Sequence, residues 1–196
     1  FDSRLKSISY QVEGGILFDR RNSKHVKEAK KWQIPQIDIV VCNLYPFEKN
    51  PSLETIDVGG PTMIRSAAKN FEIVLVVTDP KDYEKIAQLI KDREVDTKVK
   101  KEQAAKAFYH LSLYDSLIGK FLSKELFPYE FTIAFRKVQN LRYGENPHQK
   151  GAFYVAPNIA SPFANFKHLW GRDLSGTNLG DVHAGLETVR QFEEAA

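Results

Sequence analysis

The segment DVGGPTMIRSAAKN, residues 57–70, combines a carboxylate, a glycine pair and two cations. Pro61 follows the glycines and suits the first turn of a helix, where the N–H that it lacks would have no partner. On that helix, helical spacing separates a polar side from an apolar side. The polar side holds Thr62, Arg65, Ser66 and Lys69, and the apolar side holds Met63, Ile64, Ala67 and Ala68. Such a helix could bind an anion and move protons, although the pattern also fits an ordinary amphipathic surface helix.

Two further segments with chemically capable side chains flank this helix in the sequence. VCNLYPFEK covers residues 41–49, and LRYGENPHQK covers residues 141–150. The three segments, in this order and at these separations, resemble the bifunctional purine-biosynthesis family that joins IMP cyclohydrolase to AICAR transformylase. The resemblance runs along nearly the whole chain, including AAKAFYHLSLYDSLIGKFL at residues 104–122, and LRYGENPHQ is a very specific motif.

The resemblance implies two reactions of purine biosynthesis. One is formyl transfer from the co-substrate 10-formyltetrahydrofolate to AICAR, and the other is cyclisation of formyl-AICAR to IMP with loss of water. In the cyclisation a carboxamide nitrogen attacks a formyl carbon of the same molecule, so holding the reactive conformer supplies much of the rate. Side chains must then transfer protons and stabilise the developing oxyanion. The resemblance implies no metal and no covalently bound cofactor. The sequence offers no obvious metal site either, since the histidines show no metal-ligand spacing; they are His25, His110, His148, His168 and His183.

Four catalytic residues are implied for the cyclisation: Lys6, Tyr45, Asp57 and Lys69. The resemblance pairs Tyr45 with Lys6 as a proton relay, in which the cation favours the phenolate. It gives Asp57 the role of accepting a hydrogen bond or a proton from the carboxamide, and Lys69 that of neutralising the oxyanion and protonating the leaving oxygen. Without the resemblance, the lysines would be interpreted as surface groups and Asp57 as a helix cap. Substrate contacts are implied for Arg4, Ser7, Gly59, Gly60, Thr62 and Arg65.

The start of the chain departs from the family pattern. It reads SRLKSISY where the family has GRVKTLHP, with Ser3 in place of glycine, Ser9 in place of histidine and Tyr10 in place of proline. Tyr10 lacks the rigidity of proline, and Glu13 adds a negative charge near the expected phosphate-binding site. These departures support one alternative hypothesis, a degenerate copy of the enzyme.

A second group of candidate residues lies later in the chain. Arg142, Tyr143 and His148 match the AICAR-binding motif of the transformylase, and Asn178 matches an asparagine of a nucleotide-contacting segment. Arg142 suits a phosphate because its donors are planar and always charged. The catalytic Lys-His pair of the family is expected beyond Ala196. We therefore expect an internal fragment without transformylase activity and with little or no cyclohydrolase activity by itself.

The elements that must position these residues alternate between strand and helix. Continuous apolar runs at 37–43 and 73–77 predict strands buried on both faces. Helices are predicted over about 22–32, 57–70, 80–91 and 97–122. The alternation predicts an α/β fold with a parallel sheet, and the resemblance implies a doubly wound sheet of the methylglyoxal-synthase-like type, here incomplete. Ligands gather at the carboxyl ends of such strands, where Asn43, Leu44 and Tyr45 follow the first strand.

A second α/β domain is expected to begin after Leu126. Phe127-Pro128 marks the boundary, so the resemblance implies a partial cyclohydrolase domain over 1–126 and the start of a transformylase domain over 127–196. Alternating residues predict a half-exposed strand at 131–138. A short strand is expected near 152–155, and a helix from about Asp181.

Composition limits the classes of partner. The net charge is +3, and the lysines and arginines are scattered rather than gathered with aromatics, which argues against binding long nucleic acids. The single cysteine, Cys42, excludes an internal disulfide and fits a reducing cytoplasm. No signal peptide or membrane-spanning run is seen.

The resemblance implies small nucleotides (AICAR, formyl-AICAR and IMP) and folate as ligands, and a homodimer of the parent enzyme. A non-catalytic, phosphate-sensing module of the methylglyoxal-synthase-like type is the alternative. LRYGENPHQK argues against it, since such a sensor has no use for that motif.

Overall fold

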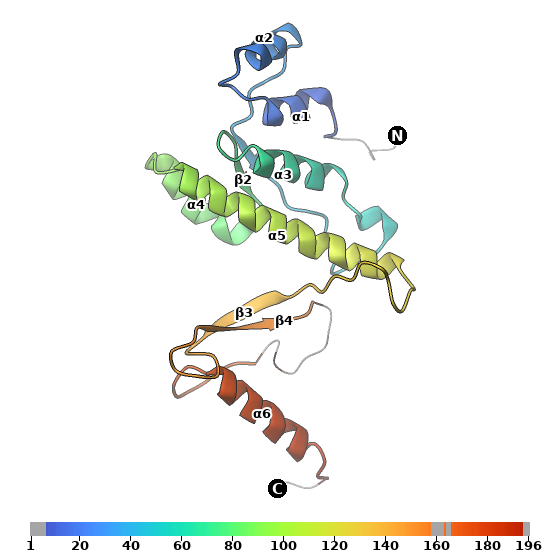
Figure 1. Ribbon diagram of the computed structural model, residues 1–196, viewed down its shortest axis with the longest axis vertical. Helices are drawn as coiled ribbons and strands as arrows, with labels where there is room; N and C mark the ends of the chain where they lie inside the picture. Colours follow the sequence, from blue (N-terminus) through green and yellow to red (C-terminus); the bar gives the residue numbers. More distant parts are fainter. Residues whose placement is uncertain (1–6, 158–162, 164–165, 194–196) are drawn as a thin grey trace. The chain divides into compact units, whose positions relative to one another are not determined.

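The computed structural model describes residues 7–157, 163 and 166–193. Within it the chain forms two compact units, the first extending to Tyr129 and the second beginning at Glu130. Figure 1 labels α1 to α5 and β2 in the first unit, and β3, β4 and α6 in the second. The first unit also contains β1. In the described part of the chain, no helix has both the length and the apolar character needed to cross a membrane.

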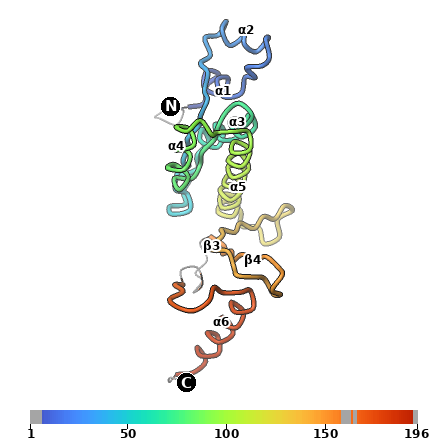
Figure 2. Tube along the Cα trace, turned by 90° about the vertical axis from the view of Figure 1, so that its left-hand side faces the viewer, coloured from blue at the N-terminus to red at the C-terminus, as the bar shows by residue number. Residues whose placement is uncertain are grey.

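A small parallel sheet lies at the centre of the first unit. Strand β1 (Ile39–Val41) pairs with β2 (Leu75–Val77) in parallel, with Val40 opposite Val76. Helix α3 (Gly59–Lys69) connects the two strands, and α5 (Thr97–Leu122) packs against both α3 and β2. Figure 2 shows α3 beside the long helix α5. This α/β arrangement confirms the predicted parallel pairing.

The core of the first unit lies between β2 and the pair of helices α3 and α5. Val76 faces this core, which is completed by buried side chains of both helices, among them Ile64, Ala67, Ala107 and Leu111. On the opposite face of β2, Leu75 and Val77 pack against Ile86 of α4 (Tyr83–Lys91). Burial of apolar side chains on both faces explains the continuous apolar sequence of β2.

Strand β1 differs from its prediction. Val40 is buried, but Ile39 is 40% and Val41 is 57% exposed, so the strand is buried on one face and not on both. Ile39 and Val41 are exposed because α4 packs against Leu75 and Val77 of β2 and not against β1. In the part of the chain that the structure describes, no element covers the neighbouring face of β1.

The helix ends follow their capping residues. Asn22 accepts a hydrogen bond from the Lys24 N–H at the start of α2 (Ser23–Lys31), in the range where the sequence predicts a helix. Asp79 does the same for a short 3₁₀ helix, η2 (Pro80–Asp82), which leads into α4. The bounds of α5 are those predicted, and its cap is Asp96, whose carboxylate accepts from the Val99 N–H at 2.8 Å.

Helix α1 (Tyr10–Leu17) was not predicted. Ser9, one of the departures from the family pattern, is its N-cap and accepts a hydrogen bond from the Val12 N–H at 3.2 Å. Two glycines, which disfavour helix, conceal it in the sequence. Packing explains why glycine is needed in this helix. A Cβ at Gly15 would lie 2.6 Å from the Pro35 carbonyl oxygen, so only glycine allows this close approach.

The second unit contains a hairpin and a helix. Strand β3 (Arg136–Leu141) pairs with β4 (Gly151–Val155) in an antiparallel ladder that is irregular between Lys137 and Gln139. The strand predicted at 131–138 therefore begins and ends later. Helix α6 (Gly176–Val189) begins before the predicted Asp181, because Ser175 is buried and caps it.

Candidate functional site

The Asp57 carboxylate lies at the N-terminus of α3. Its Oδ1 accepts a hydrogen bond from the Gly60 N–H at 2.8 Å. The first N–H groups of a helix lack intrahelical partners, and the helix dipole makes this end positive. The Asp57 carboxylate therefore lies at the positive end of the α3 dipole.

The glycine pair lets other segments approach this end of α3. A Cβ at Gly60 would lie 2.5 Å from Asp57 Oδ2 and 2.9 Å from Leu44 Cδ2. A Cβ at Gly59 would overlap the Ser7 hydroxyl. Glycine alone permits these contacts, so Asp57, Leu44 and Ser7 all lie against the first turn of α3.

The loop after β1 brings Tyr45 to the same end. Leu44 touches the first turn of α3, and the next residue, Tyr45, is 44% exposed. Phe47 is buried, and its N–H donates to the Tyr45 carbonyl oxygen at 2.7 Å. The loop is thus fixed by one buried aromatic side chain while the Tyr45 side chain remains accessible, as a proton-transferring group requires.

Tyr114 of α5 makes hydrogen bonds with the segment that leads into α3. Its hydroxyl accepts a hydrogen bond from the Asp57 N–H at 2.7 Å and donates one to the Thr55 carbonyl oxygen at 2.9 Å. Burial raises the pKa of Tyr114, and the bond from the Asp57 N–H acts in the opposite direction. The nearby side chains of Asp57, Asp115 and Tyr45 raise this pKa further.

Two polar residues of α3 have their own partners. The Thr62 hydroxyl donates to the Val58 carbonyl oxygen at 2.8 Å, inside the helix. The Arg65 guanidinium forms an ion pair with Asp115 of α5 and is about half exposed. Arg65 is therefore oriented by α5, with part of its surface accessible to solvent.

Ser66 is a correction to the predicted polar side of α3. It is 8% exposed, and its hydroxyl donates to Glu13 Oε2 at 2.5 Å. Helix α1 packs against this side of α3, which places Ser66 in the contact between the two helices. The Glu13 carboxyl is therefore hydrogen-bonded to Ser66 through Oε2, and its Oε1 is buried without a hydrogen-bond partner.

Lys69 lies at the other end of α3 from Asp57. It is exposed in the last turn, ten residues after Gly59. At 1.5 Å per residue the two ends of the helix are about 15 Å apart. Among the four predicted catalytic residues, the structure brings Tyr45 and Asp57 to one region, and the catalytic role of Lys69 stays a prediction.

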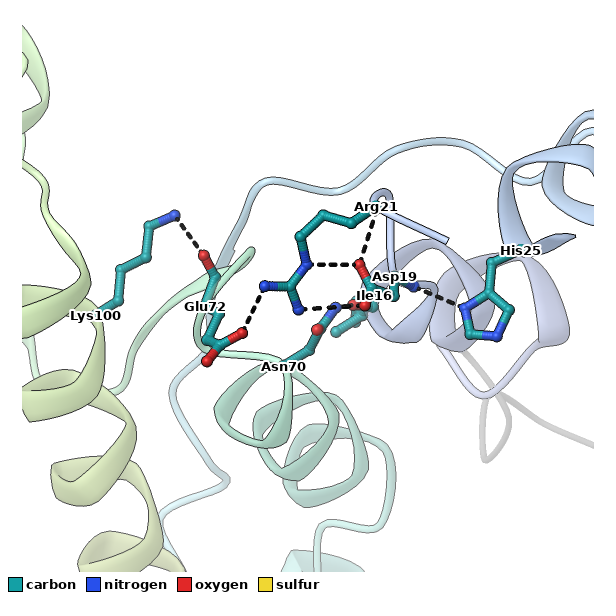
Figure 3. A network of polar contacts seen from close by, with 7 residues as sticks. All are labelled: Ile16, Asp19, Arg21, His25, Asn70, Glu72 and Lys100. Atoms are coloured by element: carbon teal, nitrogen blue, oxygen red, sulfur yellow. Dashed lines mark hydrogen bonds and ion pairs between the residues drawn. The ribbon is translucent and has the colours of Figure 1, made fainter. Parts of the chain in front are cut away.

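The C-terminal end of α3 meets a polar network that the sequence did not reveal (Figure 3). Arg21 forms ion pairs with Asp19 and with Glu72, at 3.0 and 2.7 Å. The hydrogen bonds from Arg21 lower the pKa of the Asp19 carboxyl. Beside this network, the Asn70 amide nitrogen donates to the Ile16 carbonyl oxygen at 2.7 Å. These contacts join α1, the loop before α2 and the end of α3, which indicates a structural role for this end of the helix.

Two predicted residues lie outside the described part of the chain. They are Arg4 and Lys6, so the Lys6–Tyr45 pairing stays a prediction. Ser7, the first described residue, is half-buried against Gly59.

The second unit gathers its own candidate residues at the N-terminus of α6. The Arg142 N–H donates to the Leu174 carbonyl oxygen at 2.8 Å, and the Gly176 N–H donates to the Tyr143 carbonyl oxygen at 3.0 Å. The Arg142 guanidinium lies 4.8 Å from the centre of the Tyr143 ring. An exposed arginine beside a helix N-terminus is an arrangement that suits a phosphate.

His148 and Asn178 are placed differently within this unit. His148 is exposed in a turn, next to Gln149, whose Oε1 accepts from the N–H groups of Glu145 and Asn146. The side-chain amide oxygen of Asn178 (Oδ1) accepts a hydrogen bond from the Ser175 N–H at 3.2 Å, in a capping box. The predicted nucleotide-contacting asparagine thus uses its side-chain oxygen to cap α6.

Other candidate chemistry is limited. In the described ranges, no group of three or more His, Cys, Asp or Glu side chains could hold a metal ion. The Cys42 thiol is partly buried, and burial together with the nearby Asp57 raises its pKa. A raised pKa keeps the thiol protonated, which argues against a nucleophilic role.

Comparisons with known proteins identify the family. Residues 67–196 match the family model described as the AICARFT/IMPCHase bienzyme. The chain is 45% identical over 204 residues to the bifunctional purine biosynthesis protein PurH of Clostridium botulinum (strain Kyoto / Type A2), and 43% identical over 209 residues to that of Bacillus cytotoxicus. The chain therefore belongs to the AICARFT/IMPCHase bienzyme family. Each alignment covers 100% of this chain and 41% of the relative, so the chain spans less than half the length of these curated relatives.

A solved structure supports the fold. The protein described as "Crystal structure of ForH" is 32% identical, with a TM-score of 0.55 over 60% of this chain and 65% of that chain. The likeness agrees with an α/β fold that has a small parallel sheet and flanking helices.

Proposed function

We propose that the first unit carries part of an IMP cyclohydrolase site and that the second unit lies in the start of an AICAR transformylase domain, whose boundary we place between residues 126 and 127, just before the second unit begins at Glu130. The observation that carries this proposal is the meeting of Asp57, the Tyr45 loop and Ser7 at the N-terminus of α3. Family membership supports it independently, because the family model is that of a bienzyme with these two activities.

In the proposed cyclisation, the Asp57 carboxylate accepts a proton or a hydrogen bond from the carboxamide of formyl-AICAR. Its bond to the Gly60 N–H keeps the carboxylate at the helix end. The exposed Tyr45 hydroxyl, paired with Lys6, relays protons to the oxygen that leaves as water. The positive end of the α3 dipole and the Arg65 guanidinium face anionic parts of the substrate. The role proposed for Lys69, neutralising the oxyanion, requires its side chain to extend from the last turn of α3 toward the helix N-terminus.

For the second unit, we propose that Arg142, Tyr143 and His148 contribute to the AICAR subsite. The Arg142 guanidinium, held against the Tyr143 ring, binds the phosphate. Formyl transfer from 10-formyltetrahydrofolate then belongs to the protein at its natural length, which we place in the cytoplasm as a homodimer. The small nucleotides and the folate are its ligands.

The sheet of the first unit is inferred to be of the doubly wound, methylglyoxal-synthase-like type. Strand β2 supports this inference, because α4 covers one of its faces and α3 with α5 covers the other. A non-catalytic phosphate sensor of the same fold is the weaker alternative. The bienzyme family model extends from residue 67 to residue 196, through the Arg142 loop and α6, and a sensor has no need of these elements.

The proposal is tested by following IMP formation from formyl-AICAR with the protein at its natural length. Tyr45→Phe is expected to lower the rate by about 100-fold, in the range of a lost acid–base group, with little change in the unfolding temperature. Tyr109→Phe is the matched control, since Tyr109 is 78% exposed on α5. The 196-residue chain by itself is expected to show no transformylase activity and little or no cyclisation. Wild-type rates from Tyr45→Phe would contradict the assignment of this site.

A further inference from the structure

Tyr114 is a buried residue that the proposed chemistry does not use directly. It lies on α5, is 6% exposed, and its hydroxyl both accepts and donates a hydrogen bond. The donor to it is the Asp57 N–H, and the acceptor from it is the Thr55 carbonyl oxygen. Both partners lie in the segment that leads into α3, more than fifty positions away in the sequence.

The segment that carries Asp57 needs such support. Residues 56–58 join the short 3₁₀ helix η1 (Leu53–Thr55) to α3, and neither helix includes them. The carboxylate bond to the Gly60 N–H fixes Asp57 relative to α3. The two bonds of Tyr114 fix the backbone of the same segment relative to α5. Together they determine where the carboxylate lies, and catalytic groups lose much of their effect when displaced by about 1 Å.

The ring of Tyr114 contacts the loop after β1, which carries Tyr45. It packs edge-to-face against Phe47, with ring centres 6.0 Å apart. Phe47 is 2% exposed, and its N–H donates to the Tyr45 carbonyl oxygen. One side chain of α5 therefore contacts both the loop that carries Tyr45 and the segment that carries Asp57.

We propose that Tyr114 is a positioning residue for the cyclisation, whose hydroxyl holds the Asp57 segment while its ring holds the Tyr45 loop. This inference rests on the proposed function, and it adds α5 to the elements that build the site. The hydroxyl has no substrate contact in this role. It acts through the Asp57 backbone.

The test compares Tyr114→Phe with Tyr109→Phe in the protein at its natural length. Hydrogen–deuterium exchange of a peptide that covers residues 53–60 reports the Asp57 N–H bond, and steady-state cyclisation of formyl-AICAR reports catalysis. In Tyr114→Phe, exchange in this peptide is expected to be about tenfold faster and kcat at least about tenfold lower, with little change in KM. Exchange in peptides of β2 and α4 should stay at the wild-type level and shows that the variant is folded. Tyr109→Phe should match wild type in every measurement.

Phe47→Leu separates the hydroxyl from the ring contact. It keeps both hydrogen bonds of Tyr114, so exchange at residues 53–60 should remain at the wild-type level and kcat should fall less than in Tyr114→Phe. Unchanged exchange or a wild-type kcat in Tyr114→Phe overturns the proposal, and so does an equal loss of kcat in Phe47→Leu. A wild-type protein that forms no IMP overturns the proposed function instead, while the exchange data still decide whether Tyr114 fixes the Asp57 segment.

Discussion

Replacing Gly60 with alanine should displace the Asp57 carboxylate. The new Cβ would lie 2.5 Å from Asp57 Oδ2 and 2.9 Å from Leu44 Cδ2. Both atoms are side-chain ends that can rotate, so the structure accommodates the methyl group by moving Asp57 and breaking its bond to the Gly60 N–H. Losing a hydrogen bond to a charged group costs about 1.5–3 kcal/mol. Alanine returns at most about 1 kcal/mol through helix propensity, which leaves a net loss of roughly 1 kcal/mol.

Gly119→Ala is the matched control for this substitution. Gly119 lies in α5, is exposed, and has no atom within 4 Å of an added Cβ. Only helix propensity acts there, so this variant should gain about 0.5–1 kcal/mol. Urea unfolding followed by circular dichroism measures both free energies of unfolding, and the cyclisation assay should show a loss of about 100-fold for Gly60→Ala alone. A Gly60→Ala variant as stable and as active as Gly119→Ala would refute the placement of Asp57 against Gly60.

Two further predictions concern polar contacts. Lys106 donates to Asp79 and to Asp82, each at 2.7 Å, and its hydrogen bond lowers the pKa of Asp79. Because the folded pKa of Asp79 lies below its unfolded value, the stabilisation is present above about pH 4 and is lost as the pH falls through the folded pKa. Lys106→Met should therefore lose about 0.5–1 kcal/mol at neutral pH, since the groups are partly exposed, and urea unfolding should show the difference from wild type shrinking in acid. Ser175→Ala removes the fully buried cap of α6 and should lower the stability of the second unit by about 1 kcal/mol, with exposed Ser123→Ala as control; equal unfolding midpoints would contradict the capping role.

Local signals in the sequence were sufficient for most helices. Local sequence patterns gave the bounds of α5 and nearly those of α2, because the residues that determine a helix are adjacent in the chain. Helix α1 was missed because Gly14 and Gly15 disfavour helix, and their contacts with residues 34–37 are not visible in a local pattern. The exposure of Ile39 and Val41 was missed for a similar reason, since an apolar run does not show which neighbour covers it.

The candidate site was predicted only in part. The motifs placed Asp57, the glycines and Tyr45 near one another, and the close approaches at Gly59 and Gly60 agree with that placement. Helical spacing put Lys69 on the same side of α3 as Thr62 and Arg65, but spacing says nothing of the distance along the axis, which separates Lys69 from Asp57. Tyr114 escaped notice because its contacts join segments far apart in the sequence, although it stands within a motif that carried the family resemblance.

The central claim is that the Asp57 carboxylate takes part in closing the purine ring. The most direct measurement is kcat for IMP formation from formyl-AICAR by Asp57→Asn in the protein at its natural length, with Asp92→Asn as the control. Asp92 is exposed at the end of α4, where its carboxylate accepts a hydrogen bond from the Gln88 amide. Asp57→Asn keeps an oxygen for the Gly60 N–H but cannot take a proton, so kcat should fall about 100-fold or more while Asp92→Asn keeps the wild-type value. A wild-type kcat in a folded Asp57→Asn variant would contradict the account.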